Sequence, residues 1–215
     1  MDLQLAGKSA LVTAASKGLG KAAARQLALE GARIAICARS DLLQETAREI
    51  GAESGVDVLA IRADMTRQEE IDRLVQSTIE RFDQIDILVI NAGGPPPGNF
   101  LDLVPDDWSK AVELTLMSAV RLCYATVPHM LEKGSGSIVA IDSISVKQPV
   151  DNLILSNSLR MAVIGMLKSM ANELGPRGIR INSINPTFTW TERVEQLLAN
   201  RAAGNDSSIE AEAAK

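Results

Sequence analysis

Short apolar runs alternate with helical segments along most of this chain. The runs have the length and composition of buried strands and lie at residues 9–13, 33–37, 56–62, 85–90, 137–142 and 180–184. The segments between them include residues 68–82, where apolar side chains recur on one helical face. Strands that alternate with helices predict right-handed crossovers and a parallel sheet covered on both faces. We therefore expect a single-domain, doubly wound α/β fold with three layers.

Two longer helical segments carry more apolar surface than one sheet face can cover. Residues 105–133 are apolar on several faces, so this helix should be buried on more than one side, and Pro128 should kink or end it. The second segment, residues 152–174, has apolar side chains at Leu159, Val163, Met166, Leu167 and Met170. Such surface indicates packing against another subunit, and we expect a homodimer or homotetramer.

Composition excludes several classes of function. The 215 residues are 46% hydrophobic and 23% charged, which suits one globular domain, and the net charge of −5 argues against a nucleic-acid partner. No run reaches the roughly 18 apolar residues of a membrane span, and we expect no signal peptide, because Asp2 and Lys8 flank no long apolar run. Cys37 and Cys123 lie in apolar segments, which favours buried thiols in a reducing compartment. We expect a cytoplasmic protein with no membrane partner, and one histidine with two distant cysteines predicts no metal site.

A glycine-containing turn follows the first apolar run and leads into an alanine-rich helix. In such a turn the backbone can approach a pyrophosphate, and the first helical N–H groups point at it. The turn predicts a dinucleotide site; the alternative is a plain strand-to-helix turn. Its expected cofactor-binding residues are Thr13, Ala14, Ser16, Lys17, Gly18, Leu19 and Gly20. Ala14 should have a strained backbone if it takes a conformation that suits glycine.

The end of the second strand bears on the choice of dinucleotide. An acidic residue there would bind the ribose 2′-hydroxyl of NAD, but this chain has Ala38 and Arg39. Arg39 can pair with a 2′-phosphate, and Lys17 can assist. We therefore favour NADP(H) over NAD(H); the alternative is that both side chains are solvated surface charges.

The motifs and their order resemble the short-chain dehydrogenase/reductase (SDR) family over about residues 5–195, and most closely its 3-oxoacyl-[acyl-carrier-protein] reductases. Thr13, Gly18 and Gly20 match the family's Thr-Gly-x-x-x-Gly-x-Gly turn, although Ala14 replaces the first glycine. The resemblance implies a Rossmann-type fold. It also implies that helices 105–133 and 152–174 pair across subunits.

The resemblance implies further cofactor contacts along the chain. Asp64 and Met65 match an Asp-Val pair that borders the adenine. Asn91, Ala92 and Gly93 match the Asn-Ala-Gly that lies beneath the cofactor. Two more matches, Pro186 and Thr191, fit the Pro-Gly-x-x-x-Thr that borders the nicotinamide, although Thr187 replaces its glycine.

The catalytic positions depart from the family pattern. In the family a serine binds the substrate carbonyl, a tyrosine is the general acid, a lysine binds the ribose and lowers the tyrosine pKa, and an asparagine holds a water. Ser143 matches the serine, but Ser156, Arg160 and Thr115 stand at the other three positions, so Tyr-x-x-x-Lys becomes Ser-x-x-x-Arg. Serine is a far weaker acid than tyrosine and shorter. Arg160 can still hold ribose hydroxyls, but it stays protonated and cannot relay a proton.

Another group would then have to donate the proton. Lys147, in the loop after Ser143, is our candidate if burial and a nearby Arg160 depress its pKa; the alternative is a solvated loop lysine. Tyr124 lies in the middle of a helix and His129 at the far end of it, so neither is a candidate.

The C-terminal part of the chain has no strand pattern. We expect a domain over residues 1–200 and a polar, poorly ordered tail over 201–215. Family members continue for a few dozen residues with a seventh strand and a final helix. Either the sequence stops early, or the sheet lacks its last strand.

Two functions follow from these features. The first is an NAD(P)-dependent oxidoreductase that reduces a small-molecule ketone or 3-oxoacyl substrate through an atypical active site. The second is a catalytically silent relative that binds a dinucleotide or a partner protein.

Overall fold

The computed structural model describes residues 2–187 and 189–213. Contacts divide the chain into two compact units, Met1–Asn185 and Pro186–Lys215. The whole parallel sheet lies in the first unit, and the regular elements described in the second unit are helices.

The elements of the first unit follow the expected alternation. Its six strands are β1 (Ser9–Val12), β2 (Arg33–Ala38), β3 (Val58–Arg62), β4 (Ile87–Ile90), β5 (Gly136–Ile141) and β6 (Ile179–Ile184). Its α-helices are α1 (Gly18–Leu29), α2 (Leu43–Ser54), α3 (Gln68–Phe82), α4 (Pro105–Ala111), α5 (Ser118–Lys133) and α6 (Ile154–Leu174). Shorter helical turns are η1 (Phe100–Asp102), η2 (Val112–Met117), η3 (Ile144–Val146) and η4 (Gly175–Arg177).

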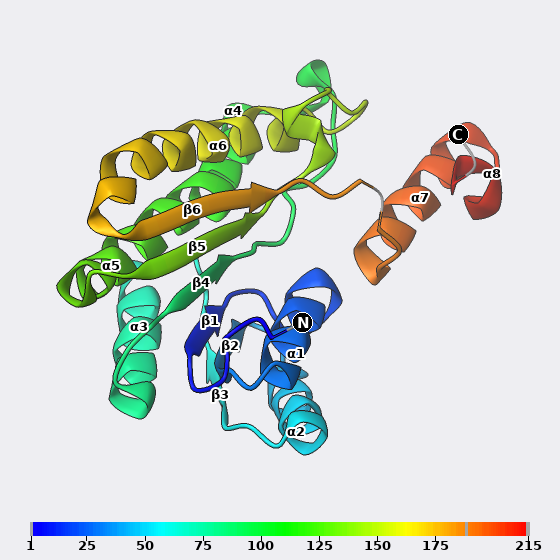
Figure 1. Ribbon diagram of the computed structural model, residues 1–215. Coiled ribbons are helices and arrows are strands. Elements are labelled where there is room, and N and C mark those ends of the chain that lie inside the picture. The colour runs from blue at the N-terminus through cyan, green and yellow to red at the C-terminus, as the bar shows by residue number, and fades with distance from the viewer. Residues whose placement is uncertain (1, 188, 214–215) are drawn as a thin grey trace. The chain divides into compact units, whose positions relative to one another are not determined.

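The strands form one sheet in the order β3-β2-β1-β4-β5-β6, and every neighbouring pair is parallel (Figure 1). After β1 the chain builds outward to β2 and β3, and then returns to place β4 on the other side of β1. The order therefore reverses between β1 and β4. In open parallel sheets ligands bind at such a reversal, beyond the carboxyl ends of the strands.

Helices cover both faces of the sheet, which confirms the doubly wound α/β fold. One face packs against α3, α5 and α6 through a core that includes Phe82, Leu122 and Met130. The other face packs against α1 and α2. Ala24 and Ala28 of α1 are fully buried there, and their small side chains let the helix lie close to β1 and β2.

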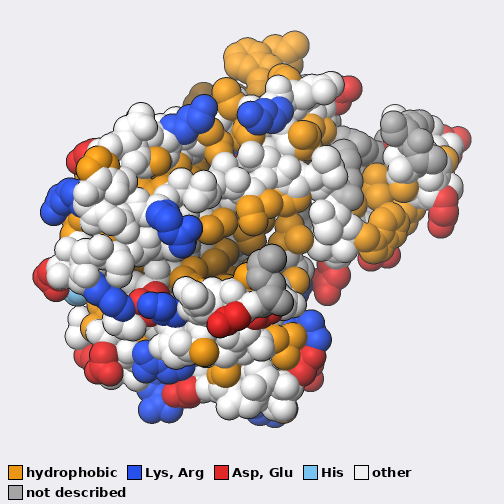
Figure 2. All heavy atoms as spheres, viewed as in Figure 1, with side chains coloured by type: hydrophobic (Ala, Val, Ile, Leu, Met, Phe, Trp, Pro, Cys, Tyr) orange, Lys and Arg blue, Asp and Glu red, His pale blue; other side chains and the backbone are white. Residues whose placement is uncertain are grey.

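The second face is covered unevenly. Over β5 and β6, on the side away from α6, Val139 and Ile141 are half-buried and Ile184 is 56% exposed. Figure 2 shows hydrophobic side chains in the hollowed middle of this face. Among residues 2–185 no helix packs over this part of the sheet.

Observed element bounds differ from the predicted ones by one or two residues for most strands and helices. The predicted helix at 105–133 is α4, a π-helical segment at Val112–Met117, and α5. Pro128 was expected to kink or end this helix. It lies inside α5, which continues to Lys133, so the expectation of an end there is wrong.

The second unit contains α7 (Glu192–Asn205) and α8 (Ile209–Ala213). Thr191 caps α7, because its Oγ1 accepts a hydrogen bond from the Val194 N–H at 3.4 Å. The Glu212 carboxylate accepts a hydrogen bond from Asn205 Nδ2 at 3.1 Å and joins α8 to the end of α7. These helices were not predicted, and α7 runs across the domain boundary expected at residue 200. Within the described residues the sheet has six strands.

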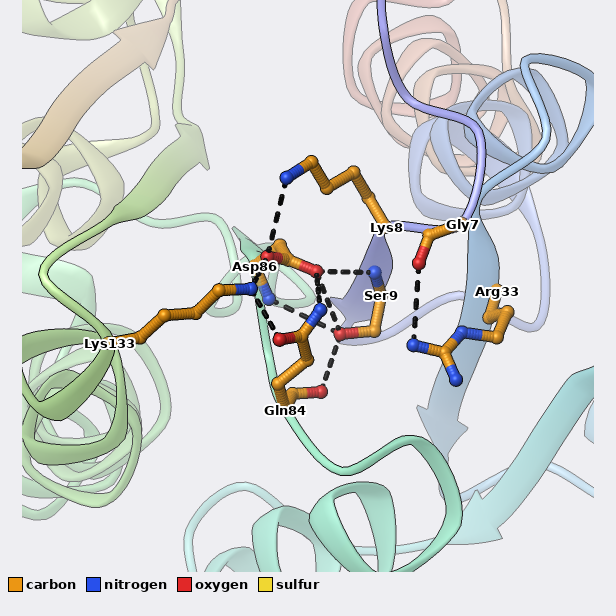
Figure 3. Close-up of polar contacts among 7 residues, drawn as sticks. All are labelled: Gly7, Lys8, Ser9, Arg33, Gln84, Asp86 and Lys133. Atoms are coloured by element: carbon orange, nitrogen blue, oxygen red, sulfur yellow. Dashed lines mark hydrogen bonds and ion pairs between the residues drawn. The ribbon is translucent and has the colours of Figure 1, made fainter.

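A buried carboxylate ties the amino ends of β1 and β4 together (Figure 3). Asp86 Oδ2 accepts hydrogen bonds from the Ser9 N–H and from Gln84 Nε2, both at 2.8 Å. Its Oδ1 lies 2.5 Å from the Lys133 ammonium at the end of α5 and 3.9 Å from that of Lys8. Burial disfavours ionisation, but the Lys133, Ser9 and Lys8 contacts outweigh it and lower the pKa of Asp86.

This network predicts a pH-dependent contribution to stability. A carboxyl whose pKa is lower in the folded state contributes fully above its unfolded pKa, about 3.9, and the contribution is lost as the pH falls through the folded value. Asp86→Asn should therefore reduce the free energy of unfolding by about 1.5–3 kcal/mol at pH 7, with the gap to the parent closing in acid. Urea unfolding at a series of pH values measures this. A gap that is absent at pH 7, or that widens in acid, would contradict the assignment.

Candidate active site

The loops after β1 and β4 meet where the strand order reverses. Thr13 Oγ1 donates a hydrogen bond to the Asn91 carbonyl at 2.7 Å and accepts one from the Asn91 N–H at 2.9 Å. Asn91 Nδ2 donates to the Ala14 carbonyl at 3.1 Å. The sequence predicted cofactor contacts at all three residues, and the structure brings them together.

The turn after β1 has the backbone that its glycines predicted. Gly18 has a φ of +58°, which is favourable for glycine, and Ala14 has a φ of +48°, which is strained for a residue with a Cβ. A Cβ on Gly20 would lie 2.5 Å from the Ala14 carbonyl oxygen and 2.7 Å from Asn91 Nδ2. The predicted strain at Ala14 is confirmed. Glycine at position 20 lets α1 begin close against the two loops.

The N-terminus of α1 faces this turn. Lys17 precedes the helix with an extended backbone, and its side chain makes no capping hydrogen bond to the first helical N–H groups. The first turn of any α-helix leaves such N–H groups without intrahelical partners. Ser16 is held to α2 through its carbonyl, which accepts from Thr46 Oγ1 at 2.8 Å. Leu19 is half-buried. Together with the close approach of the loops at Gly20, these features fit the pyrophosphate of a dinucleotide.

At the carboxyl ends of β2 and β3, Arg39 forms an ion pair with Asp64. The Arg39 guanidinium is 69% exposed and lies 3.5 Å from Asp64 Oδ2. The other oxygen, Oδ1, accepts hydrogen bonds from the Thr66 N–H at 3.0 Å and Oγ1 at 2.8 Å. Burial opposes ionisation of Asp64, but the Thr66 and Arg39 contacts prevail and lower its pKa. The two residues predicted at the adenosine end of the cofactor are therefore neighbours.

Cys37 of β2 is a buried neighbour of Met65, one of the two residues predicted to border the adenine. Its Sγ is 3.9 Å from the sulfur of the buried Met65. Burial raises the pKa of the Cys37 thiol to about 12, and that of Cys123 likewise. Both cysteines are buried and free, as predicted.

Ser143 begins the short turn η3 directly beyond β5. Its Oγ accepts a hydrogen bond from the Ser145 N–H at 3.1 Å. A serine hydroxyl can accept one hydrogen bond and donate another. Ser156 and Arg160 lie one helical turn apart near the start of α6, and Arg160 Nε donates to Ser156 Oγ at 3.1 Å. The predicted proximity of positions 156 and 160 is confirmed.

A residue that the sequence analysis missed contacts Arg160. Asp142 lies between β5 and Ser143, and its Oδ1 is 3.2 Å from Arg160 Nη1. The two side chains are 2% and 13% exposed, respectively. The one available signal was a carboxylate at the end of an apolar strand, immediately before the predicted catalytic serine.

Thr115 and Lys147 have contrasting environments. Thr115 lies in the π-helical segment η2, and its Oγ1 is buried without a hydrogen-bond partner among the described residues. Lys147 is exposed. The burial that we expected for Lys147 is therefore absent, and its role as a proton donor stays a prediction.

The remaining predicted contacts lie in two places. Ala92 and Gly93 follow Asn91, half-buried and exposed respectively, and a Cβ on Gly93 would meet no atom within 4 Å. Pro186 and Thr191 belong to the second unit. Their proximity to a nicotinamide stays a prediction.

Comparison with known proteins identifies the family. The profile described as short chain dehydrogenase matches residues 8–202. The chain belongs to the short-chain dehydrogenase family. Among family members, the 3-oxoacyl-[acyl-carrier-protein] reductase of Synechocystis sp. is 33% identical over 198 residues, which is 91% of this chain and 79% of the relative.

Solved structures of the family agree with the fold. One of them is L-sorbose reductase from Gluconobacter frateurii, complexed with NADPH and L-sorbose. It matches with a TM-score of 0.92 at 33% identity, and the match covers 98% of this chain and 81% of the reductase. NAD+-bound xylitol dehydrogenase has a TM-score of 0.88 at 27% identity, with 93% and 77% coverage. Short-chain dehydrogenases similar to this chain thus include proteins solved with either dinucleotide.

The described residues offer neither a membrane span nor a metal site. Over residues 2–187 and 189–213, no helix has the length and apolar character needed to cross a membrane. In the same residues, no three side chains of His, Cys, Asp or Glu come together in a way that could hold a metal ion.

Proposed function

We propose that this short-chain dehydrogenase binds NADP(H) and reduces a ketone or 3-oxoacyl substrate with an altered means of proton delivery. The observation that carries the proposal is the turn at residues 13–20. The left-handed Gly18, the close packing at Gly20 and the hydrogen bond from Asn91 to Ala14 support the assignment of this turn to a pyrophosphate.

Specific side chains have roles in this proposal. The N–H groups at Gly18, Leu19 and Gly20 would bind the pyrophosphate, and Arg39 with Lys17 the 2′-phosphate. Asp64 and Met65 would border the adenine. Asn91, Ala92 and Gly93 would lie beneath the cofactor, and Pro186 and Thr191 beside the nicotinamide.

The reaction would need a hydride and a proton at the carbonyl. Bound NADPH would supply the hydride to the carbonyl carbon. Ser143 would donate a hydrogen bond to the carbonyl oxygen, and Arg160 would bind the ribose. The oxygen would take its proton from water or from Lys147, which gives an alcohol and NADP+.

A second candidate is a catalytically silent relative that binds a dinucleotide or a partner protein. It is favoured by the hydrogen bond between Arg160 and Ser156, because neither group is an acid that can be tuned near neutral pH. Thr115 replaces a third group on which the family mechanism depends, the asparagine that holds a water.

Substrate-dependent oxidation of NADPH separates the two candidates. The purified protein would be supplied with NADPH and a panel of ketones and 3-oxoacyl thioesters. Oxidation above the rate without substrate supports the reductase. NADP+ binding without oxidation for any member of the panel would favour the silent relative.

The assembly and location are also proposals. We infer a cytoplasmic homodimer or homotetramer that uses α5 and α6, with no nucleic-acid or membrane partner. Tyr124 on α5 is 79% exposed and Met161 on α6 is 52% exposed, which gives both helices apolar side chains at the surface. Light scattering measures the mass in solution, and a monomer would contradict the inference.

The choice of dinucleotide is tested by Arg39→Asp. The variant should bind NADP+ roughly 10- to 100-fold more weakly, because it loses a charge-assisted hydrogen bond to phosphate and gains repulsion, while NAD+ binding is kept. Arg81→Asp is the matched control, since Arg81 also pairs with an aspartate, Asp57, at the amino end of β3, away from the carboxyl ends of the strands. Equal NADP+ affinity in Arg39→Asp and the parent would defeat the assignment.

A further inference from the structure

Asp142 holds its carboxylate in a fixed place between β5 and α6. Its backbone N–H donates to the Ile184 carbonyl at 2.8 Å, which joins the ends of β5 and β6. Side chains alternate along a strand, so Asp142 shares a face with Ile138 and Ala140. Those two residues pack in the same core as Val163 of α6.

This carboxylate and two other groups restrain the guanidinium of Arg160. Nη1 lies 3.2 Å from Asp142 Oδ1 and 3.5 Å from the Ile141 carbonyl oxygen. Nε donates to Ser156 Oγ at 3.1 Å. Contacts to Nε and Nη1 thus hold the planar guanidinium in place, whereas Nη2 donates to none of the residues that the structure describes.

The arrangement is costly to the fold. Asp142 Oδ2 is buried and has no hydrogen-bond partner in the described chain. Burial raises the pKa of Asp142, and the charge and hydrogen bond of Arg160 only partly oppose it. Buried ion pairs can often be replaced by apolar side chains without loss of stability. A pair kept at such a cost, one residue from Ser143, indicates a role in the site.

We propose that Asp142 is a positioning residue, which fixes Arg160 so that its Nη2 group is the donor presented to the nicotinamide-side ribose. The proposal rests on the proposed function, in which Arg160 binds that ribose. In this proposal, pairing with Asp142 holds the Arg160 side chain in place, so that Arg160 is not a flexible surface cation.

The test compares two ligands by calorimetric titration. NADP+ spans both halves of the site, whereas adenosine 2′,5′-bisphosphate lacks the nicotinamide half. Asp142→Asn keeps the shape of the side chain but removes its charge. It should weaken NADP+ binding about tenfold or more and leave adenosine 2′,5′-bisphosphate binding unchanged. The control is Asp86→Asn. Asp86 is also buried and pairs with Lys133, but it lies at the amino end of β4, so this substitution should leave the ratio of the two affinities unchanged.

A second substitution tests whether Asp142 acts through Arg160. In the Arg160→Gln background, Asp142→Asn should cause no further loss of NADP+ affinity, because its effect is already gone. An equal loss in both backgrounds would overturn the proposal. If Asp142→Asn does not fold, Asp142→Ser replaces it in the same comparison, since it also removes the carboxylate that pairs with Arg160, and the same loss confined to NADP+ is expected.

The remaining outcomes separate this proposal from the one on which it rests. If the parent protein binds neither ligand, the proposed function fails and Asp142 has no ribose contact to position. If the parent binds both and Asp142→Asn weakens both equally, or neither, the positioning role alone is overturned.

Discussion

Replacing Ser156 by tyrosine and Arg160 by lysine together is expected to raise the rate of NADPH-dependent ketone reduction by roughly 10²- to 10⁴-fold, the usual contribution of a positioned general acid. A phenol has a pKa near 10 that an adjacent cation can lower, whereas a serine hydroxyl is far outside that range. Ser143 and the loops at the strand-order reversal are already in place. We therefore expect the lack of a tunable proton donor to limit the rate of reduction in the parent protein.

The control for this gain is Ser158→Tyr with Arg160→Lys. Ser158 lies on the same helix but is exposed, whereas Ser156 is only 8% exposed, so a tyrosine at 158 should add no activity. Reduction would be followed by NADPH oxidation at saturating substrate. A folded Ser156→Tyr/Arg160→Lys protein that binds NADP+ and gains no rate would contradict the assignment of positions 156 and 160.

Gly20→Ala is expected to abolish detectable dinucleotide binding and to reduce the free energy of unfolding by about 1–3 kcal/mol. The added Cβ would meet the backbone carbonyl oxygen of Ala14 at 2.5 Å and the side-chain Nδ2 of Asn91 at 2.7 Å, and this Nδ2 is itself hydrogen-bonded to the Ala14 carbonyl. Moving α1 away would displace the N–H groups that we assign to the pyrophosphate. Calorimetry and urea unfolding measure the two effects.

A control substitution at the same turn should have the opposite effect on stability. Ala14→Gly removes the Cβ at a φ of +48° and should stabilise the fold by about 1 kcal/mol while keeping NADP+ binding. If Gly20→Ala bound NADP+ with the affinity of the parent protein, the assignment of the pyrophosphate to this turn would be wrong.

The fold was predictable because its signals are local. Each strand is a short apolar run, each helix has its own periodicity, and the turn at Gly18 needs a conformation that glycine favours. The sequence analysis did not predict helix α7, although Val194, Leu197, Leu198 and Ala202 recur at the spacing of one helical face. Its signal was Thr191 followed by Glu192 and Glu195, a pattern that suits a helix start.

The site was predictable only in part. Positions of Ser143, Ser156 and Arg160 followed from their order along the chain. The partner of Arg160 did not, because Asp142 is 18 residues away on a different element and only the folded sheet brings the two together. The exposure of Lys147 is likewise set by how its loop lies on the fold.

The most direct test of the central claim is calorimetric titration of the purified protein with NADP+ and, separately, with NAD+. The claim is that this short-chain dehydrogenase retains its dinucleotide site although its proton donor has changed. We predict binding of NADP+ that is tighter than binding of NAD+. Absence of binding for both dinucleotides would contradict the account.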